Sequence, residues 1–339
     1  MGEVREGARP GLRGAGPVRA RVVIVNWRRP DLTLRAARSV SPQLREGDRI
    51  VLVDNGSGDG SAATLRDAGF EVVALPDNRG FGAGVNAGAA GMTEDALVLL
   101  NNDAVAEDAF LESLLAPLGA PDGTRVGATT ARILLSGGWV RAVPADGDAL
   151  VGRDGSRWRR VDEGGTTLVN STGNVVDRSG NGYDRDWLAP ADSADAPSEV
   201  FGLCGGACAI RRTAWEQVGP FREDLFMYYE DTDLSWRLRE AGWDIRHVAG
   251  ARTRHDHAAS SGTTSPMFIT MNARNRIVVA ALHGPFPMVV RAILRTAVRT
   301  VRGPDRESVS RGLVEAVGRL PGACRERRLR RGGRRGHRA

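Results

Sequence analysis

Three carboxylates, Glu230, Asp231 and Asp233, follow the aromatic segment 226–229 and precede a helical pattern that ends near Gly242. The apolar residues of that pattern recur at helical spacing, which predicts a helix with all three carboxylates in its first turn. Acids in a first turn cap a helix and complement its dipole, for about 0.3–1 kcal/mol each, and this is the structural alternative. A carboxylate beside apolar walls, however, needs a cation, a donor or a chemical task. We therefore predict a catalytic-base site at Glu230 and Asp231.

A second polar cluster, Asn101-Asn102-Asp103, directly follows the apolar run 96–100. Hard cations such as Mg²⁺ and Mn²⁺ take oxygen ligands, often one carboxylate with the others from a diphosphate and water. We predict that Asp103 ligates such a cation. The alternative is a second helix cap, because further acids follow it in the sequence.

Two histidines, His255 and His257, bracket Asp256 and would face the same side of an extended chain. Imidazole is a common ligand of divalent metals, and it is also an ordinary packed or exposed side chain. Both interpretations stay open from the residues alone.

Two further loops could approach a nucleotide. Asp54 begins the run 54–61, where it could accept a hydrogen bond from a nucleobase or a ribose, or serve only in a turn and a helix cap. Residues 82–87 match a dinucleotide fingerprint formally. They follow the apolar run Glu71–Leu75, the third predicted strand, whereas a dinucleotide fingerprint normally follows the first. The pattern therefore favours a loop near a phosphate or sugar over a nicotinamide site.

The elements that carry these clusters alternate between strands and helices. Apolar runs of strand length occupy Arg21–Trp27, Arg49–Val53, Glu71–Leu75 and Ala96–Leu100. Fully apolar strands separated by helical stretches are typical of a parallel sheet covered on both faces. Such sheets bind ligands outside the carboxyl ends of their strands, which is where the polar clusters fall.

The pattern weakens over Leu134–Ser198, which we interpret as an acceptor-facing insertion. A buried run returns over Val200–Arg212, where glycines imply close approach of the backbone. A short strand is expected at Asp244–Val248, and the remainder of the chain is expected to be helical.

Composition limits the class of protein. The chain has 339 residues, of which 41% are hydrophobic, enough for one large α/β domain or two small ones. Its three cysteines form neither a disulfide framework nor a zinc motif, which favours thiols in a reducing compartment. No apolar run reaches the ~18 residues of a spanning helix and no signal peptide is recognisable. We expect a cytoplasmic protein, or one bound peripherally to the cytosolic face of the plasma membrane.

Seven motifs occur in order: VVIVNW, VDNGSGDGS, DNRGFGAGVNAG, LLNNDA, GGACAIRR, MYYEDTDLSWRLREAGW and RHDHAASSG. With them the sequence resembles a family 2 glycosyltransferase of the GT-A fold, closest to the bacterial branch that contains dTDP-rhamnosyltransferases. The resemblance runs from Val22 to about Arg276. It implies an α/β fold with a Rossmann-like, mostly parallel sheet flanked by helices, followed by a C-terminal helical extension.

The resemblance also implies roles for the clusters. Asp54 would contact the nucleotide base, and Asp231 of the Glu230-Asp231 pair would be the base. The D-x-D metal motif falls on residues 101–103 with Asn101 in place of its first acid, so Asp103 remains as ligand of Mg²⁺ or Mn²⁺, joined by His255 in preference to His257. We assign donor binding to Asn26, Asp54, Asn55, Asn78, Arg79, Gly80, Asn86, Asn101 and Asn102, and acceptor binding to Gly205, Gly206, Asp233 and Trp236.

The expected activity is an inverting glycosyl transfer. A departing diphosphate needs a cation, and the acceptor hydroxyl needs a base on the opposite face of the sugar. With one base and no second nucleophile, we expect single displacement of L-rhamnose from dTDP-L-rhamnose to a cell-surface glycan or polyprenyl-linked acceptor. The alternatives are a sugar nucleotidyltransferase-like enzyme and, because of Asn101, a catalytically inactive membrane-associated scaffold.

We expect four segments: a disordered arm at 1–20, the GT-A domain at 21–264, a helical extension at 265–320, and an Arg-rich disordered tail at 321–339. Residues 325–339 contain eight arginines and one glutamate, so they carry more than the whole formal net charge of +6.

Pro287–Arg302 is predicted to form a basic amphipathic helix. Arg291, Arg295, Arg299 and Arg302 share one face, with Val289, Ile293, Ala297 and Val301 offset from it. Anionic membrane is the expected partner of this helix and the tail. The alternative is a helix that packs on its own domain beside a solvated tail. Nucleic acid is not expected, because no aromatic residues interleave with the arginines.

Overall fold

The structure is a computed structural model that describes residues 17–120, 125–143, 146–147, 149–193, 195–256 and 265–336, with side chains to residue 330. Most of the expected N-terminal arm and His257 lie outside the described residues.

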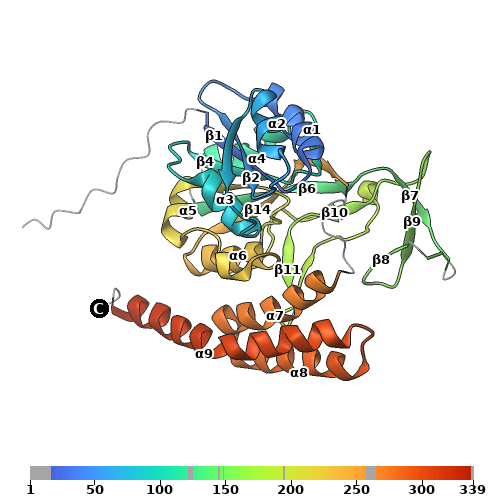
Figure 1. Ribbon diagram of the computed structural model, residues 1–339, viewed down its shortest axis with the longest axis vertical. Coiled ribbons are helices and arrows are strands. Elements are labelled where there is room, and N and C mark those ends of the chain that lie inside the picture. The colour runs from blue at the N-terminus through green and yellow to red at the C-terminus, as the bar shows by residue number, and fades with distance from the viewer. Residues whose placement is uncertain are drawn as a thin grey trace, which may run out of the picture.

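A nine-stranded sheet forms the centre of the molecule, in the order β3-β2-β1-β4-β13-β6-β14-β5, with β10 paired to β6. Its first half is parallel, as predicted: β1 (Ala20–Asn26), β2 (Arg49–Asn55), β3 (Glu71–Leu75) and β4 (Ala96–Leu100). Helices α1 (Pro30–Val40), α2 (Ser61–Asp67) and α3 (Phe81–Ala89) connect these strands. The central residues of β1, β2 and β4 are apolar because helices cover both faces of the sheet, whereas the edge strand β3 is only partly buried (Figure 1).

The second half of the sheet mixes directions. It contains β5 (Ala104–Ala106), β6 (Val126–Leu135), β10 (Val169–Ser171), β13 (Ala207–Arg211) and β14 (Asp244–His255). Strand β14 runs parallel to β6, whereas β13, β10 and β5 are antiparallel to their neighbours. The helices here are α4 (Phe110–Gly119), α5 (Arg212–Val218) and α6 (Glu230–Glu240).

The strand expected to end at Val248 is longer than predicted. Residues 249–251 interrupt the register with β6, and pairing then resumes from Arg252 to His255. The exposed residues of this interruption broke the apolar pattern, so the sequence did not reveal that the same strand continues.

The insertion between β6 and β13 forms two small sheets (Figure 1). One contains β7 (Gly138–Arg141), β8 (Leu150–Val151) and β9 (Arg157–Val161), and the other is the hairpin of β11 (Asn174–Val176) and β12 (Gly182–Asp184). Short 3₁₀ helices lie at Ser41–Gln43, Ala191–Ser193 and Glu223–Leu225.

The C-terminal region is a layer of three helices below the sheet domain in Figure 1: α7 (Pro266–His283), α8 (Phe286–Arg302) and α9 (Arg306–Gly336). The prediction of a disordered tail from residue 321 was wrong, since α9 continues through Gly336. The reason is tertiary contact, because Ala323 is buried and Glu326 forms an ion pair with Arg222. Among the residues that the structure describes, no helix is both long and apolar enough to cross a membrane.

Candidate active site

Glu230 and Asp231 open helix α6, as predicted, and their environments differ. The Asp231 carboxylate accepts hydrogen bonds from the backbone N–H of Gly205 at 3.2 Å, and from the N–H and hydroxyl of Thr232 at 2.6 and 3.2 Å. The Oε2 atom of Glu230 is buried without a partner in the structure. The helix N-terminus adds a favourable field for an anion near this point.

The charge of this pair is therefore best held by Asp231. Burial and the neighbouring Asp231 raise the pKa of Glu230 to about 8, and only its own backbone N–H opposes the rise. Burial also raises the pKa of Asp231, but donors from Gly205 and Thr232 oppose the rise. The donors therefore favour Asp231 over Glu230 as the anion of the pair, and the anionic form is the one that a general base needs.

A strained turn positions the two carboxylates. Phe226, Tyr228 and Tyr229 all have positive φ angles, of 65°, 68° and 70°. Each such conformation costs about 1–3 kcal/mol and persists only where the surroundings enforce it. Asn275 of α7 supplies part of that enforcement, since its fully buried Nδ2 lies 2.8–3.0 Å from the carbonyl oxygens of residues 225, 227 and 228. Sequence reasoning missed Asn275, which stands inside an otherwise ordinary helical pattern.

Asp103 and His255 meet as predicted, although 152 residues separate them. The antiparallel register of β14 and β5 pairs His255 with Ala104, the residue after Asp103. The Nε2 atom of His255 lies 2.9 Å from Asp103 Oδ1 and 3.4 Å from Asn101 Nδ2. Burial alone would raise the pKa of Asp103, but the contact with His255 holds it below its usual range.

These residues fit a divalent cation. The side-chain oxygen Oδ1 of Asn170 lies 2.7 Å from His255 Nδ1, so a proton on Nδ1 would be satisfied there and Nε2, which faces Asp103, could ligate a cation. Rotation of the Asn101 amide would present an oxygen at the same point. Within the described residues no three His, Cys, Asp or Glu side chains converge at metal spacing, so substrate oxygens or water would have to complete the coordination. Asn170, on β10, was missed because its segment gave little pattern.

Two adjacent glycines, Gly205 and Gly206, connect Asp231 to the Asn101–Asp103 turn. Gly205 donates to Asp231, and the carbonyl of Gly206 accepts the backbone N–H of Asn101 at 2.8 Å. A Cβ atom on Gly206 would lie 3.4 Å from Asn101 Nδ2. Gly205 and Gly206 therefore lie between the Glu230-Asp231 pair and the Asn101–Asp103 turn.

On the other side of the site, Asp54 lies at the end of β2 and Asn26 at the end of β1. The register of the two parallel strands pairs these residues directly. Asn26 Nδ2 donates to Asp54 Oδ1 at 2.7 Å, and Ser57 donates to both carboxylate oxygens. A carboxylate has about four lone-pair positions, so one remains for a ligand.

Of the other residues predicted to bind the nucleotide-sugar donor, some support neighbouring loops and others are exposed to solvent. Asn55 holds the loop at 78–80 through contacts with Asn78, Arg79 and Gly80. Both amide hydrogens of Asn86 are directed to Phe221 and Glu223. In this structure Asn86 therefore supports the neighbouring loop, whereas we had predicted that it contacts the nucleotide-sugar donor. Arg79 is half-exposed and forms an ion pair with Glu223 at 2.6 Å, while Asn102 lies in the turn after β4.

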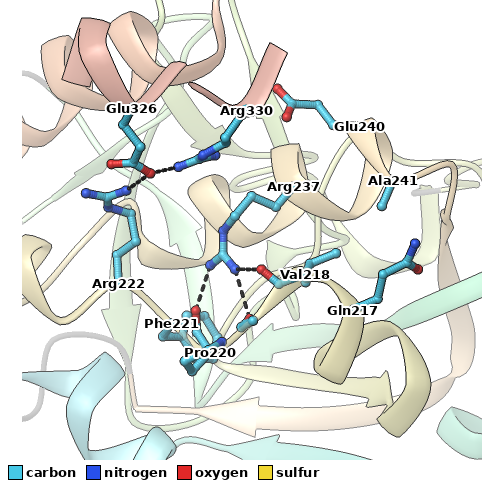
Figure 2. A pocket seen from close by; sticks show the side chains of 11 residues that line it. Gln217, Val218, Pro220, Phe221, Arg222, Arg237, Glu240, Ala241, Glu326 and Arg330 are labelled. Atoms are coloured by element: carbon cyan, nitrogen blue, oxygen red, sulfur yellow. Dashed lines mark hydrogen bonds and ion pairs between the residues drawn. The ribbon is translucent and has the colours of Figure 1, made fainter. Parts of the chain in front are cut away.

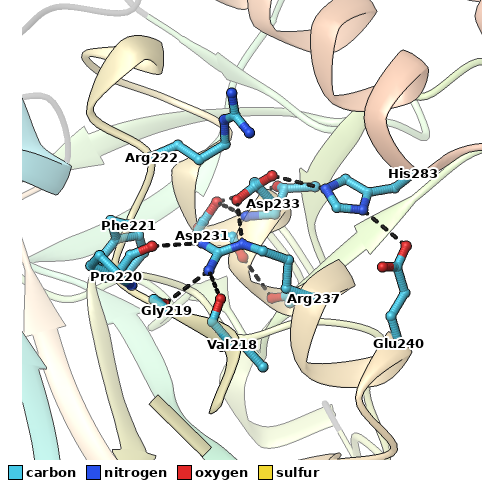
Figure 3. A network of polar contacts seen from close by, with 12 residues as sticks. Val218, Gly219, Pro220, Phe221, Arg222, Asp231, Asp233, Arg237, Glu240 and His283 are labelled. Atoms are coloured by element: carbon cyan, nitrogen blue, oxygen red, sulfur yellow. Dashed lines mark hydrogen bonds and ion pairs between the residues drawn. The ribbon is translucent and has the colours of Figure 1, made fainter. Parts of the chain in front are cut away.

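Asp233 does not face the site, contrary to the acceptor-binding prediction. Its side chain is fully buried, with Oδ2 2.8 Å from Arg237 Nε and Oδ1 2.8 Å from His283 Nε2 (Figure 3). The Nδ1 atom of His283 faces Glu240 at 3.0 Å, so both ring nitrogens must donate and the ring is an imidazolium. Trp236 stacks on the same ring with an interplanar angle of 5°, which also makes it a structural residue here. Sequence spacing placed both on α6 without showing that they face α7.

A third carboxylate, which was not predicted, lies near Asp231. Asp184 of β12 hydrogen-bonds the side chains of Ser171 and Cys204. Burial, reinforced by the charge of Asp231, raises the pKa of Asp184 to about 6. The insertion thus contributes a carboxylate next to Asp231.

A cavity of about 690 Å³ lies at the opposite end of α6 (Figure 2). Its arginines are already engaged: Arg237 binds the carbonyls of residues 218–220, and Arg222 and Arg330 pair with Glu326. We assign the chemistry to the carboxylate clusters and not to this cavity.

Comparison with known proteins agrees with this geometry. The profile described as "Glycosyl transferase family 2" matches residues 21–188, and "Glycosyl transferase family group 2" matches residues 164–293. The N-acetylglucosaminyl-diphospho-decaprenol L-rhamnosyltransferase of Mycobacterium tuberculosis is 30% identical over 226 residues, which cover 63% of this chain and 68% of the relative. The chain belongs to glycosyltransferase family 2. Within it, the chain falls in the rhamnosyltransferase-like branch.

Solved structures show that this glycosyltransferase has the GT-A fold. GalNAc-T7, solved with UDP, GalNAc and Mn²⁺, matches with a TM-score of 0.57 at 16% identity, over 86% of this chain and 54% of the other. The mannosyltransferase PcManGT of Pyrobaculum calidifontis, solved with GDP-Man and Mn²⁺, matches with a TM-score of 0.52 at 15% identity, over 90% and 87% of the two chains.

Proposed function

We propose that this glycosyltransferase transfers L-rhamnose from dTDP-L-rhamnose, with inversion, to a hydroxyl of a lipid-linked or cell-surface glycan. The single observation that carries the proposal is the Gly205-Gly206 connection. It holds the carboxylate of Asp231 beside the Asn101–Asp103 turn. The choice of rhamnose and of a lipid-linked acceptor draws on the rhamnosyltransferase relative.

In the proposed reaction Asp231 accepts the proton of the acceptor hydroxyl. The acceptor oxygen then forms its bond to the anomeric carbon while the bond from that carbon to the diphosphate oxygen breaks. The nucleoside diphosphate leaves with the electron pair, on the face of the sugar opposite the acceptor. General-base assistance of this kind contributes typically 10²–10⁴-fold.

Asp103 and His255, with the Asn101 amide, would hold Mg²⁺ or Mn²⁺. A divalent cation supplies Lewis-acid neutralisation of the charge that develops on a departing diphosphate. Asn170 fixes the His255 ring so that Nε2 faces Asp103. On the donor side, Asn26 and Ser57 hold Asp54 in position for the nucleotide.

A donor panel tests this function. We expect dTDP-L-rhamnose to raise the thermal midpoint more than UDP- and GDP-sugars do, since a ligand at ~100 times its Kd adds about 2.7 kcal/mol of stability. Transfer to a lipid-diphosphate-linked N-acetylglucosamine should give the inverted anomer by NMR. Selective stabilisation by a different nucleotide sugar would reassign the donor, and a retained anomer would refute the single displacement.

A further inference from the structure

Helix α8 presents its larger apolar side chains outward. Only Ala292 and Thr296 of this helix are fully buried, where they contact Arg276 of α7. The exposed apolar residues form a stripe along the helix: Phe286 (75% exposed), Val290 (36%), Leu294 (60%), Val298 (53%) and Val301 (67%). A helix that faced only water would be expected to place these residues inward.

This stripe differs from the apolar side predicted from the sequence. Val289 and Ile293 are half-buried and pack against the core of the helical layer. The stripe that remains in contact with solvent starts at Phe286 and recurs every three or four residues, so it follows one side of the helix.

Arginines border this stripe along its length. Arg291, Arg295, Arg299 and Arg302 each directly follow a stripe residue, and all four are exposed. Helix α8 contains no acidic residue. We refer to the five apolar and four arginine residues together as the α8 face.

We propose that the α8 face docks on an anionic lipid bilayer, with the apolar stripe at the interface and the arginines on the headgroups. Helices that lie in a membrane interface combine this kind of apolar stripe with flanking cations. A second copy of the chain is a poorer partner, because a twofold contact would bring one arginine row against another. Lipid phosphates instead offer the opposite charge next to an apolar layer.

The β11–β12 hairpin connects the α8 face to the base. At its turn, Ser179 accepts a hydrogen bond from Arg295 at 3.0 Å, and a Cβ on Gly180 would lie 3.1 Å from Ala280. Beside this turn, the backbone N–H of Gly182 donates to the hydroxyl of Tyr229 at 3.1 Å, and Tyr229 precedes Asp231 by two residues. Docking would thus direct the acceptor side of the site toward lipid headgroups. This orientation rests on the proposed function, whereas the docking itself does not.

Sedimentation of the full chain with vesicles tests the docking without any sugar substrate. We expect binding to vesicles of phosphatidylcholine with phosphatidylglycerol at low salt, reduced but not abolished at high salt. The arginine contribution is screened by salt, and the apolar contribution is not. Vesicles of phosphatidylcholine alone should retain only the weak, salt-resistant part.

Paired substitutions locate the contact. Each cation near such a surface is worth roughly five-fold in binding. Arg291→Gln with Arg299→Gln should therefore weaken low-salt binding about 25-fold. Arg38→Gln with Arg66→Gln removes the same charge from exposed positions on α1 and α2, on the opposite side of the molecule, and should leave binding unchanged (Figure 1).

Leu294→Ser with Val298→Ser should abolish the salt-resistant part and keep the salt-sensitive one. Both positions are more than half exposed, so the variant should fold, as circular dichroism can verify. The proposal is overturned if both α8 variants bind like the unmodified chain. It is also overturned if only Arg325→Gln with Arg328→Gln on α9 weakens binding, or if vesicles do not bind and the α8 variants instead dissociate a dimer in sedimentation velocity. Failure of rhamnosyl transfer would leave these binding results intact.

Discussion

Two adjacent acids share the entrance of α6, and hydrogen bonding separates their roles. Asp231 receives three donors, while one oxygen of Glu230 has none. Adjacent carboxylates in a buried site cannot both ionise cheaply, so the donors select Asp231 as the anion. The choice of Asp231 over Glu230 as the base therefore rests on these three hydrogen bonds.

Asp231→Asn should lower kcat by about 10²–10⁴-fold and leave donor binding nearly unchanged. The control is Glu230→Gln, which mimics the neutral acid and should cost far less. Because burial raises the pKa of Asp231, wild-type kcat should fall on acidification at a pH above the ordinary aspartate value of about 3.9. Near-normal turnover of Asp231→Asn, or an equal loss in both variants, would remove Asp231 from the role of base.

Activity should require a divalent cation. Asp103→Ala should lose Mn²⁺ binding, because it removes the carboxylate that lies 2.9 Å from His255 Nε2. Mn²⁺ binding can be followed by electron paramagnetic resonance, with and without nucleoside diphosphate. Asn102→Ala in the same turn is the control and should bind Mn²⁺ normally. Full turnover in excess EDTA would exclude the metal.

At the scale of elements, helix α7 of the C-terminal region supports helix α6. It contributes Asn275 to the strained turn before α6 and His283 to the acid network behind it. Helix α6 is therefore held at two points, the turn before it and Asp233, by a helix from outside the sheet domain.

Asn275→Ala should lower kcat by up to about 10²-fold, since small displacements of catalytic groups have effects of that size. It should also lower stability by about 1–3 kcal/mol, because buried carbonyls lose their donor. Asn272→Ala is a matched control on the same helix, since its amide bonds only the Phe268 carbonyl one turn away. Donor affinity, measured below the melting temperature, should be normal in both. A stability loss without any change in kcat would make Asn275 purely structural.

His283→Gln should lower the free energy of unfolding by about 3 kcal/mol near pH 6, the lower end for a broken buried pair, because Arg237 still neutralises Asp233. Burial alone would lower the folded-state pKa of His283, but its hydrogen bonds to Asp233 and Glu240 outweigh burial and raise the pKa. Its stabilising contribution is thus fully present below about pH 6.5 and is lost as pH rises through the raised value.

Urea unfolding at several pH values checks this difference, which should shrink as the pH becomes alkaline. The pKa of Asp233 is lowered to about 2 by the same contact with His283. Because Asp233 stays ionised across this pH range, it adds no second pH-dependent contribution to stability. A difference that is independent of pH would mean that the ring is not an imidazolium in the folded protein.

For the whole molecule, the end of α9 belongs to the folded structure. A chain that ends after Leu320 loses the buried Ala323 and the ion pair between Glu326 and Arg222. We expect its melting temperature to fall by several degrees, since ~1 kcal/mol corresponds to about 2–4 °C at 150–250 residues. Transfer to a soluble acceptor should persist, because no catalytic candidate lies beyond α7. Arg325→Gln with Arg328→Gln keeps these contacts and should melt normally. An unchanged melting temperature of the shortened chain would show that α9 beyond Leu320 contributes nothing to stability.

The sequence alone was sufficient to predict the parallel strands, because apolar runs of strand length between polar turns report burial on both faces. It also predicted where Asp54, Asp103 and Asp231 stand, because each follows the end of an apolar segment or opens a helix. These are local properties, encoded by the spacing of neighbouring residues.

Only the tertiary structure decided which of these residues meet. The contact of Asp103 with His255 depends on the register of β14 with β5, and the assignment of Asp233 depends on His283 in another helix. The helical course of α9 and the outward stripe of α8 depend likewise on the elements packed beside them. Spacing along a chain determines which side a residue takes on its own element, but the partner on that side is set by packing between segments that lie far apart in sequence.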